Sequence, residues 1–562
     1  MKTLFQILFT LIFLFSCNSL RVVQKLPESI GPNYGVATQG IYATKAAVEI
    51  FEKGGNAIDA AVAASFTISV ERPHSTGIGG GGFMLFREAA SKKIYAIDFR
   101  ERAPIASTEN MFLDELGNPI ATLSINGKKA IATPGLVAGL LEIHEKFGKL
   151  SREDVMAPAI DLAEKGFKIY PTLAKALAQK EEELKKDPEA SKIFLDENKK
   201  ALKEGQILIQ KDLAHTLKLI AKDGKKVFYQ GEIAKAFEDS HLSVTKKDLS
   251  EYVVKWREPL KGSFKGYNIF SMPPPSSGGI HVLQFLSMLE NDHLKEKGFL
   301  SAQSIHLAAS ALQSAFADRA KYLGDPDFVK VPALELTSKD YAKKRRAEFN
   351  PLHASKAFEV AAGKIPGFEH EETTHLSIID KYGNMIATTQ TINGYMGSSV
   401  VLPHTGIVLN NEMDDFSAKP GASNLFGAIG SKANAIAPKK TPLSSMSPTL
   451  VLDEKERPVL SLGAPGGTRI ISCVAQTILN YLEFKLPPYE SVASARYHQQ
   501  WLPDELDIEP GKIPTTTIEQ LKQMGHNVQE KAINCNVMAV ALEDNLFRAV
   551  SDPRDIGTSH AR

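Results

Sequence analysis

The sequence predicts a folded chain of the α+β class, with helices through its first two-thirds and short strands in its last third. Up to about Leu323, apolar residues recur at helical spacing and glycines end the runs, which is typical of packed helices. From Thr373 to Arg562, short runs of β-forming residues alternate with turn residues instead. Hydrophobic residues make up 43% and charged residues 23% of the 562 positions, as in ordinary globular proteins.

Charge and cysteine content exclude several functional classes. Lys and Arg number 66 against 65 Asp and Glu, so the net charge is +1 and no basic surface for nucleic acid is indicated. Three cysteines are too few for a disulfide scaffold or a cysteine-rich zinc site. No apolar run reaches the roughly 20 residues that span a bilayer.

Residues 1–16 have the pattern of a cleaved export signal, with Met1-Lys2 before a mostly apolar stretch over 4–15. The segment Leu14-Phe15-Ser16-Cys17 resembles the processing box of bacterial lipoproteins, so we expect Cys17 to be the first mature residue and to carry lipid. Ordinary cleavage nearby is the alternative. Either way the protein is expected to be exported, either periplasmic or anchored to a membrane by lipid. Cys473 and Cys535 are then either paired or isolated buried thiols.

The first elements are helices punctuated by glycine. Ala43, Ala47, Ile50 and Phe51 share one helical face, and Gly54-Gly55 ends that helix. Asn56 is suited to cap the alanine-rich helix that follows. A run of four glycines, 79–82, then precedes the apolar segment 83–86.

The central part of the chain is expected to be mostly helical. Residues 173–263 are rich in lysine and glutamate, and the charge run 180–186 indicates a solvated helix face. Residues 301–323 read as another amphipathic helix, with Ile305, Leu312 and Phe316 facing inward. The polar stretch 337–368 is expected to be an exposed linker.

A predicted hairpin follows this linker. Residues 376–379 and 385–389 have strand character, and 380–384 supply turn residues. Pairing about this turn places Thr373 beside Thr391 to Asn393. If the linker were cut, Thr373 would carry both a hydroxyl and a free α-amine, whose ordinary pKa near 8 suits a general base. A threonine activated by its own amine is a known nucleophile, although an ordinary strand is the simpler interpretation.

Three polar segments follow the hairpin. Residues 410–416 hold three acids and two amides. This composition fits part of an active site, but also a hydrated turn or a metal-binding loop. Residues 442–449 form a hydroxyl cluster between prolines, which an ordinary loop would also explain. Residues 463–469 contain Gly466-Gly467 before an apolar run, so their backbone N–H groups are expected at a helix start, where an oxyanion binds well. This segment lacks the ending of a phosphate-binding P-loop.

Taken together, these motifs resemble the γ-glutamyltranspeptidase family. The resemblance runs from about Val36 to the C-terminus and rests on 80–84, 98–104, 373–375, 410–421, 442–449, 466–467 and 499–505, which occur in family order. It implies a four-layer αββα sandwich of the N-terminal-nucleophile hydrolase type. It also implies self-cleavage between Glu372 and Thr373, giving a large subunit, residues 17–372, and a small catalytic subunit, residues 373–562, that stay associated and intertwined.

The resemblance assigns the reacting groups by position. Thr373 matches the family's nucleophile, and Thr391 matches the residue that hydrogen-bonds it. Gly466 and Gly467 match the oxyanion hole. The implied reaction is attack of Thr373 on the γ-glutamyl amide of glutathione or a related donor, followed by transfer to water or to an amino acid or dipeptide. The resemblance implies no metal and no organic cofactor.

The resemblance also assigns the substrate-binding groups. Arg100 matches the arginine that pairs with the α-carboxylate of the donor, assisted by the hydroxyl groups of Ser444 and Ser445. The groups that match the receptors of the α-ammonium are Asn393, Glu412 and Asp415. Donors are thus expected at one end of the site and acceptors at the other.

Two positions depart from the pattern of many bacterial members. Phe426 stands where a gating tyrosine is common, so the gate offers no hydroxyl. Glu412 stands where glutamine is common, and a carboxylate should hold an ammonium group at least as well. Two alternative functions remain: a related acylase of the cephalosporin or poly-γ-glutamate type, and an inactive exported binding lipoprotein.

Overall fold

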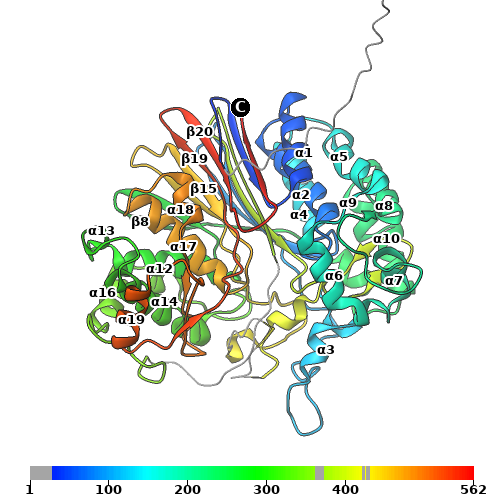
Figure 1. Ribbon diagram of the computed structural model, residues 1–562. Helices are drawn as coiled ribbons and strands as arrows, with labels where there is room; N and C mark the ends of the chain where they lie inside the picture. The colour runs from blue at the N-terminus through cyan, green and yellow to red at the C-terminus, as the bar shows by residue number, and fades with distance from the viewer. Residues whose placement is uncertain (1–27, 361–372, 420–423, 426–430) are drawn as a thin grey trace, which may run out of the picture.

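The computed structural model describes residues 28–360, 373–419, 424–425 and 431–562. Figure 1 shows two sheets in the middle of the molecule with a helical layer on either side. Strands of the two sheets lie against each other, for example β10 against β15 and β19, so the layers run helix, sheet, sheet, helix. The expected αββα sandwich is confirmed.

Among the described residues, the two sheets have seven strands each, and every pairing within them is antiparallel. The first runs β1 (Glu28–Gly31), β20 (Leu546–Ser551), β19 (Met538–Glu543), β15 (Pro458–Gly463), β14 (Thr449–Leu452), β9 (Tyr267–Ser271), β8 (Leu260–Phe264). The second runs β21 (Thr558–Ala561), β2 (Tyr34–Thr38), β10 (Thr374–Asp380), β11 (Met385–Thr391), β3 (Gly81–Arg87), β4 (Ile94–Asp98), β7 (Lys255–Arg257).

The helices on the second sheet come from the first part of the chain. The helices that contact its strands are α1 (Ile41–Glu52), α2 (Ala57–Glu71) and α4 (Leu136–Phe147). Farther out lie α5 (Arg152–Lys165), α6 (Pro171–Leu184), α7 (Pro188–Phe194), α8 (Lys211–Asp223), α9 (Lys225–Tyr229), α10 (Glu232–Asp239) and α11 (Lys246–Ser250) (Figure 1). The predicted helix stop and cap are confirmed, since α1 ends before Gly54 and Asn56 forms a capping box with Asp59 at the start of α2.

The helices on the first sheet come from two separate parts of the chain. The helices that contact its strands are α12 (Gly278–Leu289), α17 (Arg469–Leu482) and α18 (Pro488–Ala493). Farther out, α14 (Ala302–Tyr322), α15 (Ala333–Leu336) and α16 (Lys339–Ala347) pack against α12, while α13 (Leu294–Lys297) and α19 (Thr515–Gln523) pack against α14. The predicted helix over 301–323 is confirmed as α14. The expected linker over 337–368 is wrong in its first part, because α16 packs against α12 and buries Ala342 and Arg345.

The hairpin of β10 and β11 is confirmed and is longer than predicted. Its register pairs Ile379 with Met385 at the turn and Thr374 with Gln390 at the open end. In the turn, the Asp380 carboxylate accepts hydrogen bonds from the backbone N–H groups of Tyr382 and Asn384, both at 3.0 Å. β2 and β3 flank the hairpin, so its strands lie at the centre of the second sheet.

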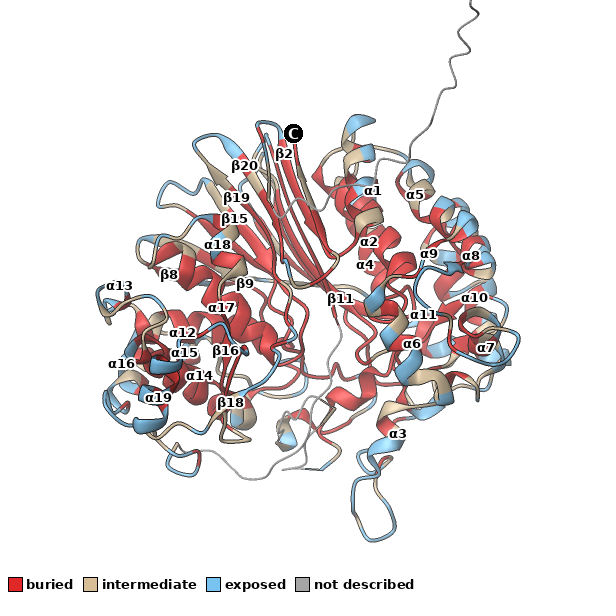
Figure 2. Ribbon diagram, in the orientation of Figure 1, coloured by how far each residue is buried: buried red, intermediate tan, exposed pale blue. Residues whose placement is uncertain are grey.

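Burial follows the layers. Figure 2 shows the strands and the inward faces of the helices buried, while the outer helix faces are exposed. A disulfide joins Cys473 on α17 to Cys535 before β19, with 6.6 Å between their Cα atoms. Within the described residues, no helix is long and apolar enough to cross a membrane.

Candidate active site

The site lies at the end of the sandwich where β10 begins and β11 ends. Continuing the hairpin register by one residue from the Thr374–Gln390 pair places Thr373 opposite Thr391, as the sequence predicted. Within the hairpin, the ring Nδ1 of His375 lies 2.8 Å from Thr389 Oγ1, and this face of β10 looks toward β15 of the other sheet. Because side chains alternate along a strand, Thr373 is expected on the same inner face as His375.

One small pocket contains nearly all of the predicted site residues. It is lined by Arg100, Arg319, Thr373, Thr391, Asn393, Glu412, Asp415, Ser444, Ser445, Met446, Gly467, Thr468 and Ile470. Its volume is only about 20 Å³, so in this uncut chain the space is nearly filled by side chains. Of the remaining predicted residues, Gly466 lines an adjoining cavity of 460 Å³. Glu372, Phe426 and Cys17 lie outside the described residues.

Arg100 is held between two carboxylates. It follows β4, and its Nη1 lies 2.6 Å from Glu412 Oε1 while its Nη2 lies 2.5 Å from Asp415 Oδ2. Its Nε donates to the carbonyl of Pro442 at 3.0 Å, and the side chain is 1% exposed. Arg100, predicted for one end of a bound zwitterion, therefore pairs directly with Glu412 and Asp415, predicted for the other end, in the uncut chain.

The acids around Arg100 are difficult to ionise. Burial raises the pKa of Glu101 to about 7, although the nearby Arg100 opposes this shift. Burial also raises the pKa of Glu412, again opposed by Arg100 and reinforced by the charges of Glu101 and Asp415. Both carboxylate oxygens of Glu101 are buried without a hydrogen-bond partner in the described chain. The pocket thus holds more negative than positive charge when all of its acids are ionised.

The chain turns sharply at Asn393 after β11, in the same pocket as the predicted nucleophile Thr373. Asn393 has a positive φ of 71°, and its backbone N–H donates to Thr391 Oγ1 at 2.8 Å. Its side-chain Nδ2 donates to the carbonyl of Asn411 at 3.0 Å, next to Glu412. These bonds fix Thr391 and Asn393 relative to the acidic segment.

The hydroxyl cluster enters the pocket just before β14. Met446 N–H donates to Ser444 Oγ at 3.1 Å, so this hydroxyl already accepts a hydrogen bond. The carbonyl of Ser444 accepts from both the backbone N–H and the hydroxyl of Ser277, each at 2.8 Å. Ser444 and Ser445 are 2% and 8% exposed, so the segment is an ordered part of the pocket wall rather than a surface loop.

The glycine turn lies between β15 and α17, as predicted. Gly466 and Gly467 have φ values of 128° and 48°. A Cβ on Gly466 would lie 2.7 Å from the carbonyl oxygen of Asn534, so both backbone conformation and space require glycine there. The turn therefore brings Gly467 into the pocket wall at the start of α17, where the helix dipole favours negative charge.

The sequence did not reveal two members of this site. Arg319 lines the pocket from α14, and only its helical position was predictable from the chain. Glu101 stands in one of the family motifs, but no role was assigned to it. Nothing in the local sequence distinguishes Arg319, because its contacts with Ser277 and Ser445 lie 42 and 126 residues away. Glu101 directly follows Arg100 in the motif 98–104, and this position is the signal that could have found it.

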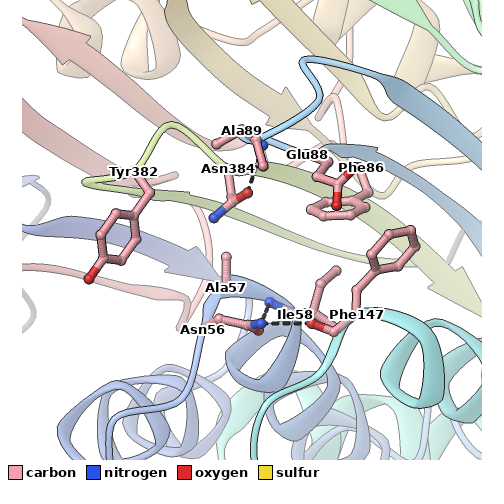
Figure 3. A pocket seen from close by; sticks show the side chains of 10 residues that line it. Asn56, Ala57, Ile58, Phe86, Glu88, Ala89, Phe147, Tyr382 and Asn384 are labelled. Carbon is pink, nitrogen blue, oxygen red and sulfur yellow. Dashed lines mark hydrogen bonds between the residues drawn. The ribbon is translucent and has the colours of Figure 1, made fainter.

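A larger cavity of 450 Å³ lies at the other end of the hairpin (Figure 3). Two polar side chains in its wall hydrogen-bond to the backbone of neighbouring segments. Asn384 accepts a hydrogen bond from Ala89 N–H at 2.8 Å, and Asn56 donates to the carbonyl of Phe147 at 2.7 Å (Figure 3). None of the predicted site residues lines it. Across the described residues, no group of three or more histidines, cysteines or acids is placed to hold a metal ion.

The sandwich, with Thr373 at the head of a central strand and a glycine turn beside it, defines an N-terminal-nucleophile hydrolase. The γ-glutamyltranspeptidase family model matches residues 43–561. A glutathione hydrolase proenzyme from Escherichia coli (strain K12) is 42% identical over 526 residues, which cover 93% of this chain and 90% of that protein. The chain belongs to the γ-glutamyltranspeptidase family.

Acylases are also similar to this chain. The acylase ACY 1 proenzyme of Pseudomonas sp. (strain SE83) is 37% identical over 515 residues, covering 90% of this chain and 88% of that protein. The crystal structure of cephalosporin acylase from Bacillus halodurans has a TM-score of 0.84 and 26% identity, covering 98% of this chain and 99% of that one.

Proposed function

We propose that this enzyme is a γ-glutamyltranspeptidase and glutathione hydrolase that acts on glutathione and related γ-glutamyl compounds. The γ-glutamyl group passes from the donor to Thr373 and then to water or to an amino acid or dipeptide. Membership of the family and the 42% identity to a glutathione hydrolase proenzyme support this proposal.

The pairing of Arg100 with Glu412 and Asp415 is the observation that carries the proposal. A γ-glutamyl donor brings an α-carboxylate and an α-ammonium on one carbon. Its carboxylate replaces the acids at Arg100, while its ammonium replaces Arg100 at the acids, so Arg100, Glu412 and Asp415 each keep a neighbour of opposite charge. A glutaryl donor lacks the ammonium and would leave Glu412 and Asp415 without a cation. This exchange favours a γ-glutamyl enzyme over a glutaryl acylase.

The proposed chemistry is a double displacement. Thr373 Oγ1 bonds to the γ-carbon of the donor while the carbon–nitrogen bond breaks, and the hydroxyl proton passes through the α-amine of Thr373 to the leaving amine. Backbone N–H groups at Gly466 and Gly467 stabilise the oxyanion, and losing one such donor typically costs about 10²–10³ in turnover. Water or an acceptor amine then attacks the ester carbon, and Thr373 regains its proton.

The α-amine must first be freed by cutting the chain. In our proposal the Thr373 hydroxyl attacks the carbonyl of Glu372, the acyl group moves from nitrogen to oxygen, and water hydrolyses the ester. The products are a large subunit, 17–372, and a small subunit, 373–562, of 190 residues. The proenzyme names of the relatives support a precursor of this kind.

Export of the protein is also part of the proposal. Residues 1–16 would be removed as a signal peptide and Cys17 would receive lipid, which places the enzyme in the periplasm or on a membrane surface. Metabolic labelling with a palmitate analogue tests this step. The label should remain on the protein with native Cys17 and disappear in Cys17→Ser; equal labelling of both would overturn lipidation at this residue.

Two measurements test the function. Mass spectrometry and N-terminal sequencing should find two fragments in the wild type, the smaller starting at Thr373, and one uncut chain in Thr373→Ala. The cut wild type should hydrolyse γ-glutamyl-p-nitroanilide at least about 100-fold faster than glutaryl-p-nitroanilide, because only the first compensates both ends of the pocket. A preference for the glutaryl compound would identify an acylase, and an uncut, inactive wild type would identify a binding protein.

Thr374→Ala is the matched control. Thr374 is the next residue, its hydroxyl lies 2.9 Å from Ser75 Oγ, and strand alternation places it on the opposite face from Thr373. This variant should cut itself and hydrolyse the γ-glutamyl compound like the wild type.

A further inference from the structure

Arg319 is a second buried cation in the pocket of Thr373. It lies near the end of α14 and is 7% exposed. Within the described chain, no carboxylate lies within ion-pair distance, 4.0 Å, of its guanidinium, whereas the buried Arg72 lies 3.1 Å from Asp555. A buried charge without a close counter-charge is costly, so its presence beside a substrate pocket calls for a ligand of opposite charge.

Two serine hydroxyls bind the Arg319 guanidinium instead. Its Nε donates to Ser277 Oγ at 3.1 Å, and its Nη2 donates to Ser445 Oγ at 3.4 Å. A guanidinium group only donates hydrogen bonds, so the Ser445 oxygen must accept. Its own hydrogen is then available to another acceptor, and the described residues provide none within hydrogen-bond distance.

The neighbouring serine is held in the same way. Ser277, which accepts from Arg319, donates its hydroxyl to the carbonyl of Ser444 at 2.8 Å. Ser444 Oγ accepts from Met446 N–H, so its hydrogen is likewise available. One guanidinium thus connects the two serines, and it leaves both of their hydrogens for a ligand.

We propose that Arg319 is a positioning residue that makes the site specific for donors with a free α-carboxylate. It holds Ser445 directly, and Ser444 through Ser277, as hydrogen-bond donors toward that carboxylate, and its charge adds to the charge of Arg100. The inference rests on the proposed function, because it assigns a role in binding the donor. An α-amide or α-ester donor could not use the positive charge at this end of the pocket.

The charge of Arg319 persists at working pH. Burial lowers its pKa to about 10, with Asp415 opposing the shift and Arg100 adding to it. The side chain therefore remains a cation near pH 7, beside the carboxylate end of the bound donor.

The test compares donor selectivity in Arg319→Gln and Arg319→Lys. Each purified, self-cleaved variant is assayed with γ-glutamyl-p-nitroanilide and with its α-carboxamide analogue. For Arg319→Gln we expect KM for the first donor to rise on the order of tenfold or more, since the charge beside the donor carboxylate and the charged hydrogen bonds that hold the two serines are lost, while kcat changes less than about threefold. KM for the amide analogue should stay unchanged, and Arg319→Lys should recover part of the selectivity.

Arg345→Gln is the matched control, because Arg345 is also buried, at 9% exposure, and donates to the carbonyl of Ser314 on the same helix α14. Its selectivity should equal that of the wild type. Equal loss of activity toward both donors in Arg319→Gln, or unchanged selectivity in both Arg319 variants, would overturn the inference. A wild-type enzyme that hydrolyses neither donor would instead refute the proposed function. If Arg319→Gln fails to cut itself, the test uses Arg319→Lys alone. Donor selectivity equal to that of the wild type in this variant would then overturn the inference.

Discussion

At the scale of single residues, Glu101 carries the least compensated charge in the site. Its carboxylate is completely buried and lies 4.0 Å from Arg100 at its nearest. Its pKa is raised to about 7 by burial, against an ordinary value of 4.5. Between these two values the folded chain keeps a proton that the unfolded chain has lost, so Glu101 lowers the folding stability as pH rises through this range.

Replacing Glu101 by glutamine should therefore stabilise the protein in a pH-dependent way. We expect Glu101→Gln to raise the thermal unfolding midpoint relative to the wild type more at pH 8 than at pH 5, because only the ionised carboxylate is costly. Differential scanning fluorimetry of the Thr373→Ala background avoids differences in self-cleavage. Glu454→Gln, in an exposed turn, is the control and should show no such trend. A gain that is equal at both pH values would contradict a buried, titrating Glu101.

The sequence was informative about residues whose neighbours are local. Thr373 and Thr391 lie one residue beyond the last pair of the hairpin ladder and line the same pocket, so counting from the turn was enough to bring them together. Arg100, Ser444 and Glu412 came only from family motifs. Arg319 was predicted as part of a helix but not as part of the site, because its contacts with Ser277 and Ser445 join segments 42 and 126 residues away.

At the scale of elements, the difference between local and distant partners also explains why the prediction of a linker over 337–368 was wrong in its first part. The helix α16 contains the charged residues Lys343 to Arg346, which favoured the prediction of an exposed linker. In the fold, Arg345 donates to the carbonyl of Ser314 at 3.1 Å and lies 3.6 Å from Asp318, so the charge is buried with partners from α14. A charged side chain that is buried with its partners leaves no apolar periodicity in the sequence. The sequence therefore did not predict this helix.

The packing of β10 against β15 gives a prediction at this scale. A Cβ added to Gly463 at the end of β15 would lie 2.3 Å from the ring of His375 on β10. The ring is hydrogen-bonded at both nitrogens, to Thr389 and Ser377, and burial lowers its pKa to about 3. The ring has no easy way to move, so the two sheets would have to separate.

We expect Gly463→Ala to destabilise the fold by about 1–3 kcal/mol, the usual cost of overpacking, and to slow self-cleavage at the adjacent Thr373. Urea unfolding monitored by fluorescence gives the first quantity, and the rate of fragment formation gives the second. Gly77→Ala is the control, because its new Cβ would find its nearest neighbours at 3.8 Å. Wild-type stability in Gly463→Ala would mean that the sheets have room here.

At the scale of the whole molecule, the disulfide between Cys473 and Cys535 connects two distant parts of the small-subunit region, 62 residues apart. The sequence left pairing and free thiols equally open. A crosslink that closes a loop of this length is expected to stabilise by up to about 4 kcal/mol, through the entropy of the unfolded chain. The double variant Cys473→Ser, Cys535→Ser should unfold at lower urea than the wild type. Addition of a reductant should lower the wild-type midpoint and leave that of the double variant unchanged.

The proposed cut at Thr373 divides both sheets rather than separating two domains. In the second sheet, β10 and β11 come after the cut, while their neighbours β2 and β3 come before it. In the first sheet, β14 from after the cut pairs with β9 from before it. The two fragments would therefore remain joined by complete strand ladders and by the core between the sheets.

We expect the cut protein to behave as one particle under native conditions. Size-exclusion chromatography should give a single peak at the size of the uncut Thr373→Ala chain, while denaturing electrophoresis of that peak shows two fragments. The fragments should separate only at urea concentrations that also abolish the circular dichroism of the sheets, because losing either fragment removes strands from both of them. Release of the 190-residue fragment from a folded remainder in dilute urea would contradict this shared architecture. If the fragments separate and the sheets unfold at the same urea concentration, cleavage frees the Thr373 amine without loosening the fold that positions it.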